Sequence, residues 1–544
     1  MKRLVVFLTG VLFVSCVSHK AVDLFASGGV RHLRDRPDGL RPSGAGAPVL
    51  ILALDGAGRD QLYGMLRAGE LPNLAALLGG DGFAHAYLDE DVLSVFPSIT
   101  MAAWTSMMTN ATPADDGIPG NEFFIRDTRE FVALAPISFV DNAPTLEIYS
   151  DGYLDRHVEV PTIYERIHER DPGALIWVSL HQIARGADDL FLTKRSALLD
   201  AAKAFASDKL DGKPSRDVYA ALDENAIAEV AAKLDSGTLP DVVTIYLPGL
   251  DSYAHTAAEG PDAARRTYLR EVIDPALRKL VVALQQRGAL ANRWVIVTAD
   301  HGHTEVLHDD HHAIAPDLPK AALEHAGFHV RAFQRKVADQ DAFSAVVAYG
   351  GPTAFVYLAD RSRCAALCDW HAPARYREDV LPAADAFWRA NADGSIVPAL
   401  RDTLDLILVR EGSDHDFRVY VGEGKTQALD EYLAAHPHPT YVDFAPRLHA
   451  LAVGAHGDRA GDILLLSHDG DRDDVAQRHY FAAPYRSFHG SPSRRDSEIP
   501  LIVASPRLSS EAVKASVDRV LGAHPTITKV GALILALRAH PPQP

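Results

Sequence analysis

The sequence has little of what defines several common protein classes. Its 544 residues include three cysteines, which leaves room for one intramolecular disulfide at most. Charged residues make up 23% and hydrophobic residues 47%, a balance typical of packed globular domains and not of disordered, collagen-like or coiled-coil chains. Basic residues are outnumbered by acidic ones, 54 against 72, for a formal net charge of −18. We expect no nucleic-acid polymer as a partner, although a small anionic substrate stays compatible where metal ions reverse the local field.

Long hydrophobic runs are rare, and the one at the N-terminus is too short to span a bilayer comfortably as a helix. Residues 4–14 are largely apolar and follow Lys2 and Arg3, a pattern typical of a signal peptide. Cys16 lies close to a bacterial lipoprotein processing site. We therefore expect residues 1–16 to direct export. The alternatives are a lipidated Cys16 anchored to the outer membrane, or cleavage after Ser18 and release into the periplasm.

The rest of the chain divides into segments that differ in composition and in hydrophobic pattern. Residues 17–47 carry many glycines and prolines without a hydrophobic period, which predicts a flexible tether. We assign 48–320 and 480–544 to one catalytic domain. Between them, at 321–479, short apolar runs alternate with polar, glycine- and proline-bearing stretches, which indicates a mixed α/β insertion.

Uninterrupted apolar runs predict the core of the catalytic domain. Residues 49–54 form one such run, which is typical of a strand buried on both faces of a parallel sheet. Similar runs follow helical patterns at 174–179, 241–247 and 294–298, and another lies at 501–504. Strands that alternate with helices predict an α/β fold with a doubly wound, mostly parallel sheet and helices on both faces.

Residue types that bind metals stand beside these predicted strands. Ligands in an open α/β sheet collect beyond the carboxyl ends of the strands. The candidates are Asp55, Asp251, His255, Asp300, His301 and His489. Each residue alone is as well explained by a cap or a turn. Together they predict two oxygen- and nitrogen-rich sites of the kind that zinc accepts.

Two further motifs complete the pattern: Pro97-Ser98-Ile99-Thr100, and Gly117-Ile118-Pro119-Gly120-Asn121. The whole arrangement resembles the alkaline-phosphatase superfamily, in particular its type I phosphodiesterase/nucleotide pyrophosphatase branch. That resemblance implies that Thr100 is the nucleophile and that Asn121 binds the phosphate. It implies two zinc sites, one formed by Asp251, His255 and His489, the other by Asp55, Asp300, His301 and the Thr100 oxygen.

The implied activity is hydrolysis of a small-molecule phosphoric ester through a phosphothreonine intermediate. Metal coordination is one way to activate a threonine hydroxyl, and two metals can stabilise both the attacking and the leaving oxygen. A periplasmic phosphomonoesterase is the main alternative, and a catalytically inactive binding lipoprotein is a second one. Related sulfatases fit less well, because their nucleophile motif is missing here. Cofactor-independent phosphoglycerate mutases use a serine nucleophile and are cytoplasmic, whereas residues 1–16 predict export.

Three residues bear on the choice of substrate. Trp104 occupies a position where many nucleotide-cleaving relatives have a histidine, and either lines the pocket or packs in the core. Threonine-dependent monoesterases of the superfamily carry Ser-Leu-Lys-x-Arg after a strand. Here His181 replaces the lysine, and Arg185 comes two residues late. Since a monoester dianion favours a fixed cation, this departure favours a diester substrate.

Two other clusters are open to more than one interpretation. For Cys364 and Cys368 we favour a structural disulfide or free thiols over a metal site, although their spacing inside a helix would be at the long end of disulfide reach. His303 and the segment 308–312 are rich in histidine. We favour a solvated loop there over an additional metal site or a substrate-contacting loop.

Overall fold

The computed structural model describes residues 29–35, 45–80, 82–135, 143–192, 216–334, 336–337, 341–364 and 366–540. The predicted signal peptide, with Cys16, lies outside these ranges. Within them, no helix combines the length and the apolarity that crossing a bilayer requires.

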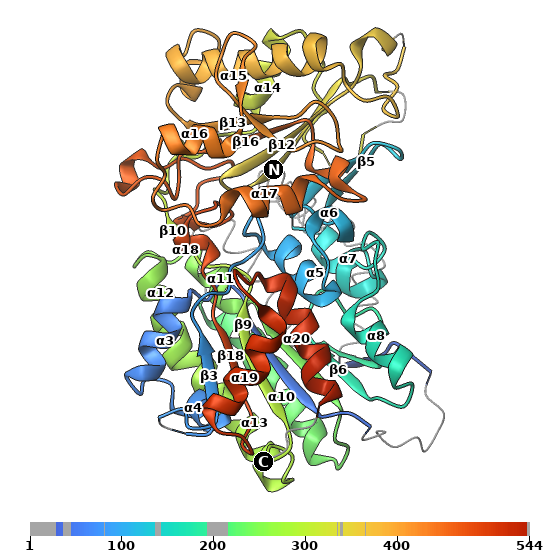
Figure 1. Cartoon of the computed structure of the whole chain (residues 1–544), viewed down its shortest axis with the longest axis vertical. Coiled ribbons are helices and arrows are strands. Elements are labelled where there is room, and N and C mark those ends of the chain that lie inside the picture. The colour runs from blue at the N-terminus through green and yellow to red at the C-terminus, as the bar shows by residue number, and fades with distance from the viewer. Residues whose placement is uncertain are drawn as a thin grey trace, which may run out of the picture.

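An eight-stranded sheet forms the centre of the larger part of the molecule (Figure 1). Its strands, in spatial order, are β1 (Val30–His32), β7 (Asp189–Phe191), β6 (Ile176–Ser179), β8 (Val242–Leu247), β2 (Val49–Leu54), β9 (Trp294–Ala299), β18 (Leu501–Ala504) and β3 (Ala86–Asp89). The five strands from β7 to β9 are parallel, whereas β1, β18 and β3 each pair antiparallel. Every residue of β2, β8 and β9 is buried, which explains why β2 is wholly apolar and why Thr244 and Thr298 are the only polar residues of β8 and β9 apart from the Tyr246 hydroxyl and the Trp294 indole N–H.

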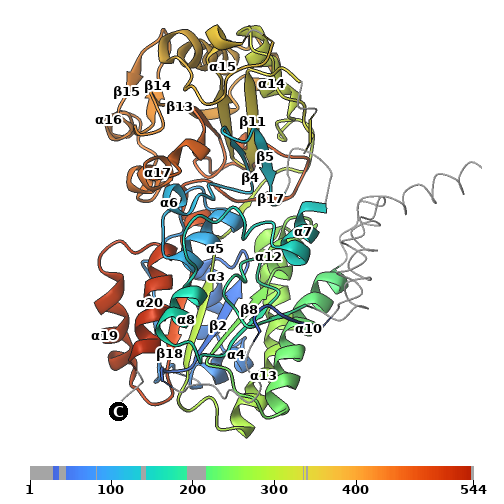
Figure 2. The ribbon, with the colours of Figure 1, turned by 90° about the vertical axis from the view of Figure 1, so that its right-hand side faces the viewer.

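Helices cover both faces of this sheet (Figure 2). One face carries α3 (Arg59–Arg67), α4 (Pro72–Leu77), α10 (Arg216–Asp235), α12 (Pro261–Tyr268) and α13 (Asp274–Gln286), which contact one another. The other carries α5 (Thr100–Thr109), α8 (Ile163–Arg170), α19 (Ser510–Leu521) and α20 (Ile527–Ala539). The prediction of a doubly wound, mostly parallel α/β sheet is confirmed.

Shorter elements line the end of the sheet that faces the insertion. They are the helices α6 (Pro113–Asp116), α7 (Ala143–Asp151), α11 (Gly249–Ala254) and α18 (Arg494–Ser497), the hairpin β4 (Glu122–Ile125) and β5 (Glu130–Ala133), and the two-stranded ladder of β10 (Thr304–Glu305) and β17 (Ser487–Phe488). The hairpin contacts the insertion, because β4 packs against the insertion strand β11.

The insertion is a second α/β unit, in the upper part of both ribbon views. Its antiparallel sheet has the order β11 (Ala345–Gly350), β12 (Thr353–Leu358), β16 (Ile463–Ser467), β13 (Leu404–Val409), β14 (Arg418–Tyr420) and β15 (Thr426–Gln427). Its helices are α14 (Asp317–His325), α15 (Leu381–Asp393), α16 (Leu429–Ala435) and α17 (Phe444–Ala452). The boundary expected at 321 falls inside α14, which packs on α15.

Part of the predicted tether belongs to the fold. Residues 30–32 form β1, which pairs antiparallel with β7 at the edge of the large sheet. Ala47 is buried, and its backbone N–H donates to the carbonyl of Arg538 at 2.7 Å. The tether prediction over 17–47 is therefore wrong for these residues. A three-residue edge strand held by backbone hydrogen bonds needs no hydrophobic period.

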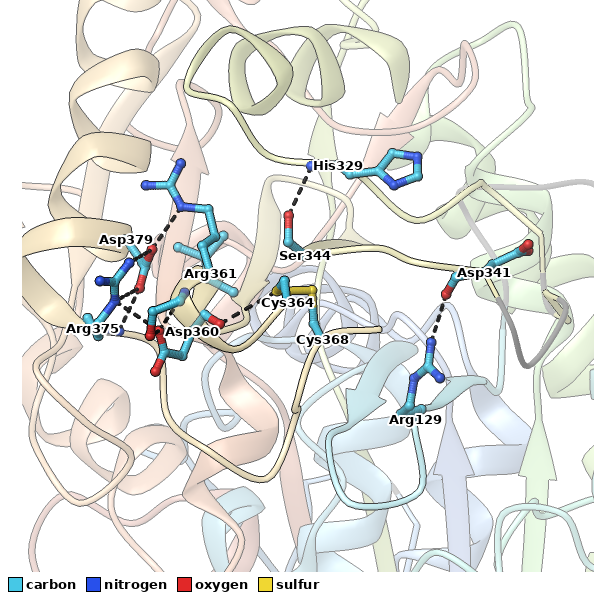
Figure 3. The surroundings of a disulfide bond; sticks show 12 residues. Arg129, His329, Asp341, Ser344, Asp360, Arg361, Cys364, Cys368, Arg375 and Asp379 are labelled. Atoms are coloured by element: carbon cyan, nitrogen blue, oxygen red, sulfur yellow. Dashed lines mark hydrogen bonds and ion pairs between the residues drawn. A yellow bond between two sulfur atoms is a disulfide. The ribbon is translucent and has the colours of Figure 1, made fainter. Parts of the chain in front are cut away.

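The two cysteines of the insertion form a disulfide (Figure 3). Cys364 and Cys368 lie in a loop after Arg361–Arg363, with their Cα atoms 3.9 Å apart. The helical spacing considered for this pair does not occur, because the chain turns back on itself between the two residues. A structural bridge is the interpretation that holds, and a metal site at these cysteines is excluded.

Candidate active site

Four chain segments meet at the carboxyl end of the parallel strands. Asp55 directly follows β2, Asp300 directly follows β9, and Asp251 lies in α11, which begins shortly after β8. The fourth segment arrives from the opposite direction. Because β18 is antiparallel, the residues before it, including His489, come to the same edge of the sheet.

The first cluster surrounds the side chain of His301. Its Nε2 atom lies 3.3 Å from Oδ1 of Asp55 and 3.2 Å from Oδ2 of Asp300. The hydroxyl oxygen of Thr100 is 3.2 Å from the same nitrogen. The structure thus brings together all four residues that the resemblance implies for one zinc site.

The second cluster surrounds Asp251. Its Oδ1 atom lies 3.3 Å from Nε2 of His255, 2.9 Å from Nε2 of His303 and 3.5 Å from Nε2 of His489. The ring of His489 also stacks on that of His301, with centroids 3.4 Å apart. The three residues implied for the second zinc site are therefore neighbours, and His303 joins them.

The solvated-loop interpretation is wrong for part of the histidine-rich segment. His303 and His312 are buried, whereas residues 308–311 are exposed as expected. The sequence contained one indication of this difference, since His303 comes directly after Asp300, His301 and Gly302, next to the end of β9.

The Nδ1 atoms of the clustered histidines all have hydrogen-bond partners. The pairs are His301 with the Gly302 carbonyl at 2.9 Å, His255 with the Ser487 carbonyl at 2.7 Å, His489 with the Ser98 carbonyl at 3.1 Å and His303 with the Ser487 hydroxyl at 3.1 Å. Carbonyl oxygens only accept, and the Ser487 hydroxyl donates its own proton to the Ala254 carbonyl at 2.9 Å. Each Nδ1 therefore carries the proton, and each Nε2 presents a lone pair.

These lone pairs face carboxylate oxygens in a buried site. A bound cation would remove the electrostatic repulsion between them. Within the part of the chain that the structure describes, Oδ1 of Asp55, Oδ1 of Asp251, Oδ2 of Asp300 and Nε2 of His303 are buried without a hydrogen-bond partner. Burial, with Asp300 and Asp251 nearby, raises the pKa of Asp55 well above its usual range, and burial lowers the pKa of His303 to about 3. Oriented imidazoles and carboxylates are the donor set that fits zinc.

Further contacts hold the first cluster in place. The hydroxyl of Tyr246 in β8 donates to Oδ2 of Asp55. The backbone N–H of Gly56 donates to Oδ1 of Asp300 at 3.1 Å. Tyr246 was not among the predicted site residues, because it lies inside an apolar strand.

Asn121 is anchored beside the start of α5. Its Oδ1 atom accepts a hydrogen bond from the backbone N–H of Met101 at 3.2 Å. Thr100 is the first residue of that helix. Because the amide oxygen is used in this way, the amide NH₂ is the end of Asn121 that is available as a donor.

The remaining predicted site residues are placed differently. Trp104 is in the core, with its ring edge-on to those of His181 and Tyr246 at centroid distances of 5.4 and 6.0 Å. His181 is fully buried, which lowers its pKa to about 3, and its Nδ1 accepts from the N–H of Ile183. Neither side chain offers a positive charge to the site.

Arg185 is committed to other partners. Its guanidinium donates to the backbone carbonyls of Asp155 and Val158, both at 2.8 Å, and to that of Val160. It also pairs with Glu165 at 3.1 Å. The structure therefore does not bring Arg185 to the metal-ligand clusters.

A separate group of His and Asp residues lies in the insertion. Oδ1 of Asp405 is 2.8 Å from Nε2 of His438, and Oδ2 of Asp471 is 2.7 Å from Nδ1 of His468. Arg472 reaches the same Asp471 oxygen at 3.1 Å. An arginine and hydrogen-bonded histidines already satisfy these carboxylates, so this group is explained as an ion-pair network.

Known proteins share this sequence pattern and this fold. The sequence model of the type I phosphodiesterase / nucleotide pyrophosphatase family matches residues 49–470. Human ectonucleotide pyrophosphatase / phosphodiesterase 5 matches with a TM-score of 0.50 at 12% identity, covering 91% of this chain and 96% of that one. Phosphonoacetate hydrolase from Sinorhizobium meliloti 1021 matches with a TM-score of 0.46 at 18% identity, covering 94% and 99%. At 12% identity, the human structure supports the fold alone.

Proposed function

Since the chain belongs to the type I phosphodiesterase / nucleotide pyrophosphatase family, we propose that it hydrolyses phosphoric esters, diesters by preference, at a two-zinc site. One observation carries the proposal. Four histidine Nε2 lone pairs converge on three buried carboxylates, and the Thr100 hydroxyl lies 3.2 Å from one of those nitrogens. This is the combination that metal-assisted attack by a hydroxyl requires.

Two groups of residues are suited to hold the metals: Asp55, Thr100, Asp300 and His301 for one, and Asp251, His255 and His489 for the other. Zinc bound there supplies Lewis acidity, which favours the alkoxide form of a bound hydroxyl and neutralises charge that develops on phosphoryl oxygens. The buried carboxylates and oriented imidazoles of the chain supply rigid positions for those charges.

Thr100 is the proposed nucleophile. Its oxygen attacks phosphorus while its proton passes to solvent, the bond from phosphorus to the leaving oxygen breaks, and that oxygen leaves as an alcohol after taking up a proton. The resulting phosphothreonine still carries the second substituent when the substrate is a diester. Water then attacks the same phosphorus, the bond from phosphorus to the Thr100 oxygen breaks, that oxygen takes up a proton, and phosphate, or a phosphomonoester from a diester, is released. Because Thr100 begins the ten-residue helix α5, the phosphoryl group lies at the positive end of that helix dipole.

Asn121 is the proposed phosphate-binding residue. Its side-chain oxygen is held by the N–H of Met101, which directs the NH₂ group to act as a donor. A preorganised amide donor stabilises charge that grows on a non-bridging oxygen without adding a charge of its own.

The preference for diesters rests on His181 and Arg185. A monoester dianion gains most from a fixed cation, but His181 is buried with its pKa lowered to about 3 and Arg185 is bound to three backbone carbonyls. The second substituent of a diester needs space or apolar contact in place of charge.

A substrate panel tests this function and separates it from the alternatives. We expect the purified, zinc-loaded protein to show a higher kcat/KM for a nitrophenyl phosphodiester than for the matched monoester. A higher value on the monoester would indicate the phosphomonoesterase. Tightly bound zinc without turnover of either ester would indicate a binding protein.

We also propose that the protein is exported and is held at the outer membrane by a lipid on Cys16. The support is the basic and apolar pattern of residues 1–16. When the full chain is expressed in a Gram-negative host, the Cys16→Ser variant should move from the membrane fraction to the soluble periplasm. Retention of the wild-type chain in the cytoplasm would contradict export.

A further inference from the structure

We propose that His303 is a metal ligand, which gives Asp251 a set of three histidine partners in place of the two that the sequence pattern implies. The inference rests on the proposed function, because it concerns the donor set of one of the two zinc sites. It also goes beyond that function, since it assigns a coordinating role to a residue outside both predicted groups.

The distances to the carboxylate of Asp251 support His303 as a metal ligand as strongly as they support His255 and His489. Its Nε2 atom is 2.9 Å from Oδ1 of Asp251, whereas those of His255 and His489 are 3.3 and 3.5 Å away. The His303 side chain is fully buried, and its Nε2 has no hydrogen-bond partner among the described residues. Asp251, His255 and His303 together satisfy the geometry of a three-ligand metal group.

A single residue orients two of these histidines. The Ser487 carbonyl accepts from Nδ1 of His255, and the Ser487 hydroxyl accepts from Nδ1 of His303. The ladder between β10 and β17 pairs Glu305 with Ser487 and so fixes this residue beside the His303 segment. His303 therefore has the support that ligand histidines have in metal sites, a hydrogen bond that sets the tautomer and the ring direction.

The backbone next to Asp55 leaves space for the His303 ring. Gly56 has a φ of +69°, and a Cβ atom there would lie 2.6 Å from Nε2 of His303 and 3.1 Å from Cβ of Asp251. Both the left-handed conformation and the close approach call for glycine. The turn that presents Asp55 is thus shaped around the imidazole of His303, independently of its distance to Asp251.

The extra imidazole makes the two sites chemically unequal. The Asp251 site becomes rich in nitrogen, whereas Asp55, Asp300 and Thr100 give the other site mainly oxygen donors. Imidazole ligands suit zinc and cobalt, whereas oxygen ligands also suit magnesium and manganese. We expect the Asp251 site to retain its metal at chelator concentrations that empty the other site.

The test measures metal binding and not turnover. Full-length protein, dialysed against chelator, is titrated with Co²⁺ and Zn²⁺, and metal content is followed with the visible absorption of the cobalt form. We expect His303→Ala and His303→Gln each to weaken one of two sites by tenfold or more and to change its cobalt spectrum. His311→Ala, which removes an exposed histidine of the same segment, should behave like the wild type.

Several outcomes would overturn the assignment. Unchanged affinity and spectrum in both His303 variants would show that His303 is not a ligand. Recovery in His303→Gln alone would show that the side chain merely donates a hydrogen bond to Asp251. If the wild type binds two metals, either result leaves the proposed function intact. A wild-type chain that binds no metal would overturn both proposals.

Thermal unfolding of each variant identifies any loss of fold. If the alanine variant is unstable, the metal titration is carried out on the glutamine variant.

Discussion

The hydroxyl oxygen of Thr100 lies 3.2 Å from Nε2 of His301, although the two residues are 201 positions apart in the sequence. Thr100 is the first residue of α5, and His301 is the second residue after the end of β9. Because the same nitrogen also lies 3.3 Å from Oδ1 of Asp55 and 3.2 Å from Oδ2 of Asp300, the hydroxyl is directed at the group of atoms suited to hold a metal.

Replacement of this hydroxyl should abolish turnover while the fold and the metals remain. We expect Thr100→Val to lower kcat by about three orders of magnitude or more, because the reaction loses its nucleophile. Thr105→Val is a matched control in the same helix, since the Thr105 hydroxyl is buried and has no hydrogen-bond partner among the residues that the structure describes. Steady-state kinetics and metal analysis on both variants decide the matter. Near-normal turnover by Thr100→Val would rule out the phosphothreonine.

The amide of Asn121 should matter through its donor end. We expect Asn121→Ala to lower kcat/KM by about 10²–10³, the usual effect of removing one donor to a developing oxyanion. Asn121→Asp keeps an acceptor for the Met101 N–H but removes the donor and adds a negative charge near phosphate, so it should be impaired at least as severely. Normal kinetics of the aspartate variant would assign Asn121 a purely structural role.

Arg185 should contribute to stability and not to substrate choice. Arg185→Met removes donors from the carbonyls of Asp155, Val158 and Val160. We expect a loss of about 1–3 kcal/mol in the free energy of unfolding, the cost of leaving such acceptors unpaired. The ratio of kcat/KM for diester and monoester should not change. A selective loss of monoester hydrolysis would instead identify Arg185 as a clamp for the dianion.

His181 should make stability depend on pH below neutrality. Burial lowers its pKa in the folded protein to about 3, whereas the unfolded chain has the ordinary value of about 6.5. Between these values the unfolded state binds more protons, so the stability that His181 contributes is complete above pH 6.5 and is lost as the pH falls toward 3.

The matched variant is His181→Asn, whose side-chain oxygen can accept the Ile183 N–H in place of Nδ1. Urea unfolding in chelator, at pH 7.5 and pH 5, keeps metal release out of the comparison. The wild type should lose about 2 kcal/mol more than the variant over this range, at about 1.4 kcal/mol per pH unit below 6.5. Equal losses would mean that His181 takes up protons in the folded state.

The sequence predicted the buried strands best. Residues 49–54 and 501–504 are β2 and β18 to the residue, because a strand covered on both faces has no polar position to interrupt its apolar run. The three residues of β1 had no comparable signature. Their place at the sheet edge depends on backbone bonds to β7, and such bonds are independent of side-chain type.

The proximity of the candidate site residues was predictable where they stand next to a strand, and less so elsewhere. Asp55 and Asp300 follow β2 and β9 directly. His303 follows His301 by two residues, but its hydrogen-bond partner Ser487 lies far along the chain, so the sequence showed its position and not its contacts. Tyr246 was missed because only the parallel register of β8 beside β2, which pairs it with Ala53, brings its hydroxyl to Asp55. Contacts of this kind follow from tertiary structure and leave no local pattern.

The position of β18 determines when during synthesis the site is complete. This strand lies between β9 and β3, and among the described strands β3 has no other neighbour in the sheet. A growing chain that ends before residue 485 lacks His489, Ser487 and the strand that joins β3 to the rest. The proposed Asp251 metal site is therefore one of the last parts of the fold to be completed, and we expect truncation before residue 485 to weaken metal binding there even though most of the proposed ligands are already made.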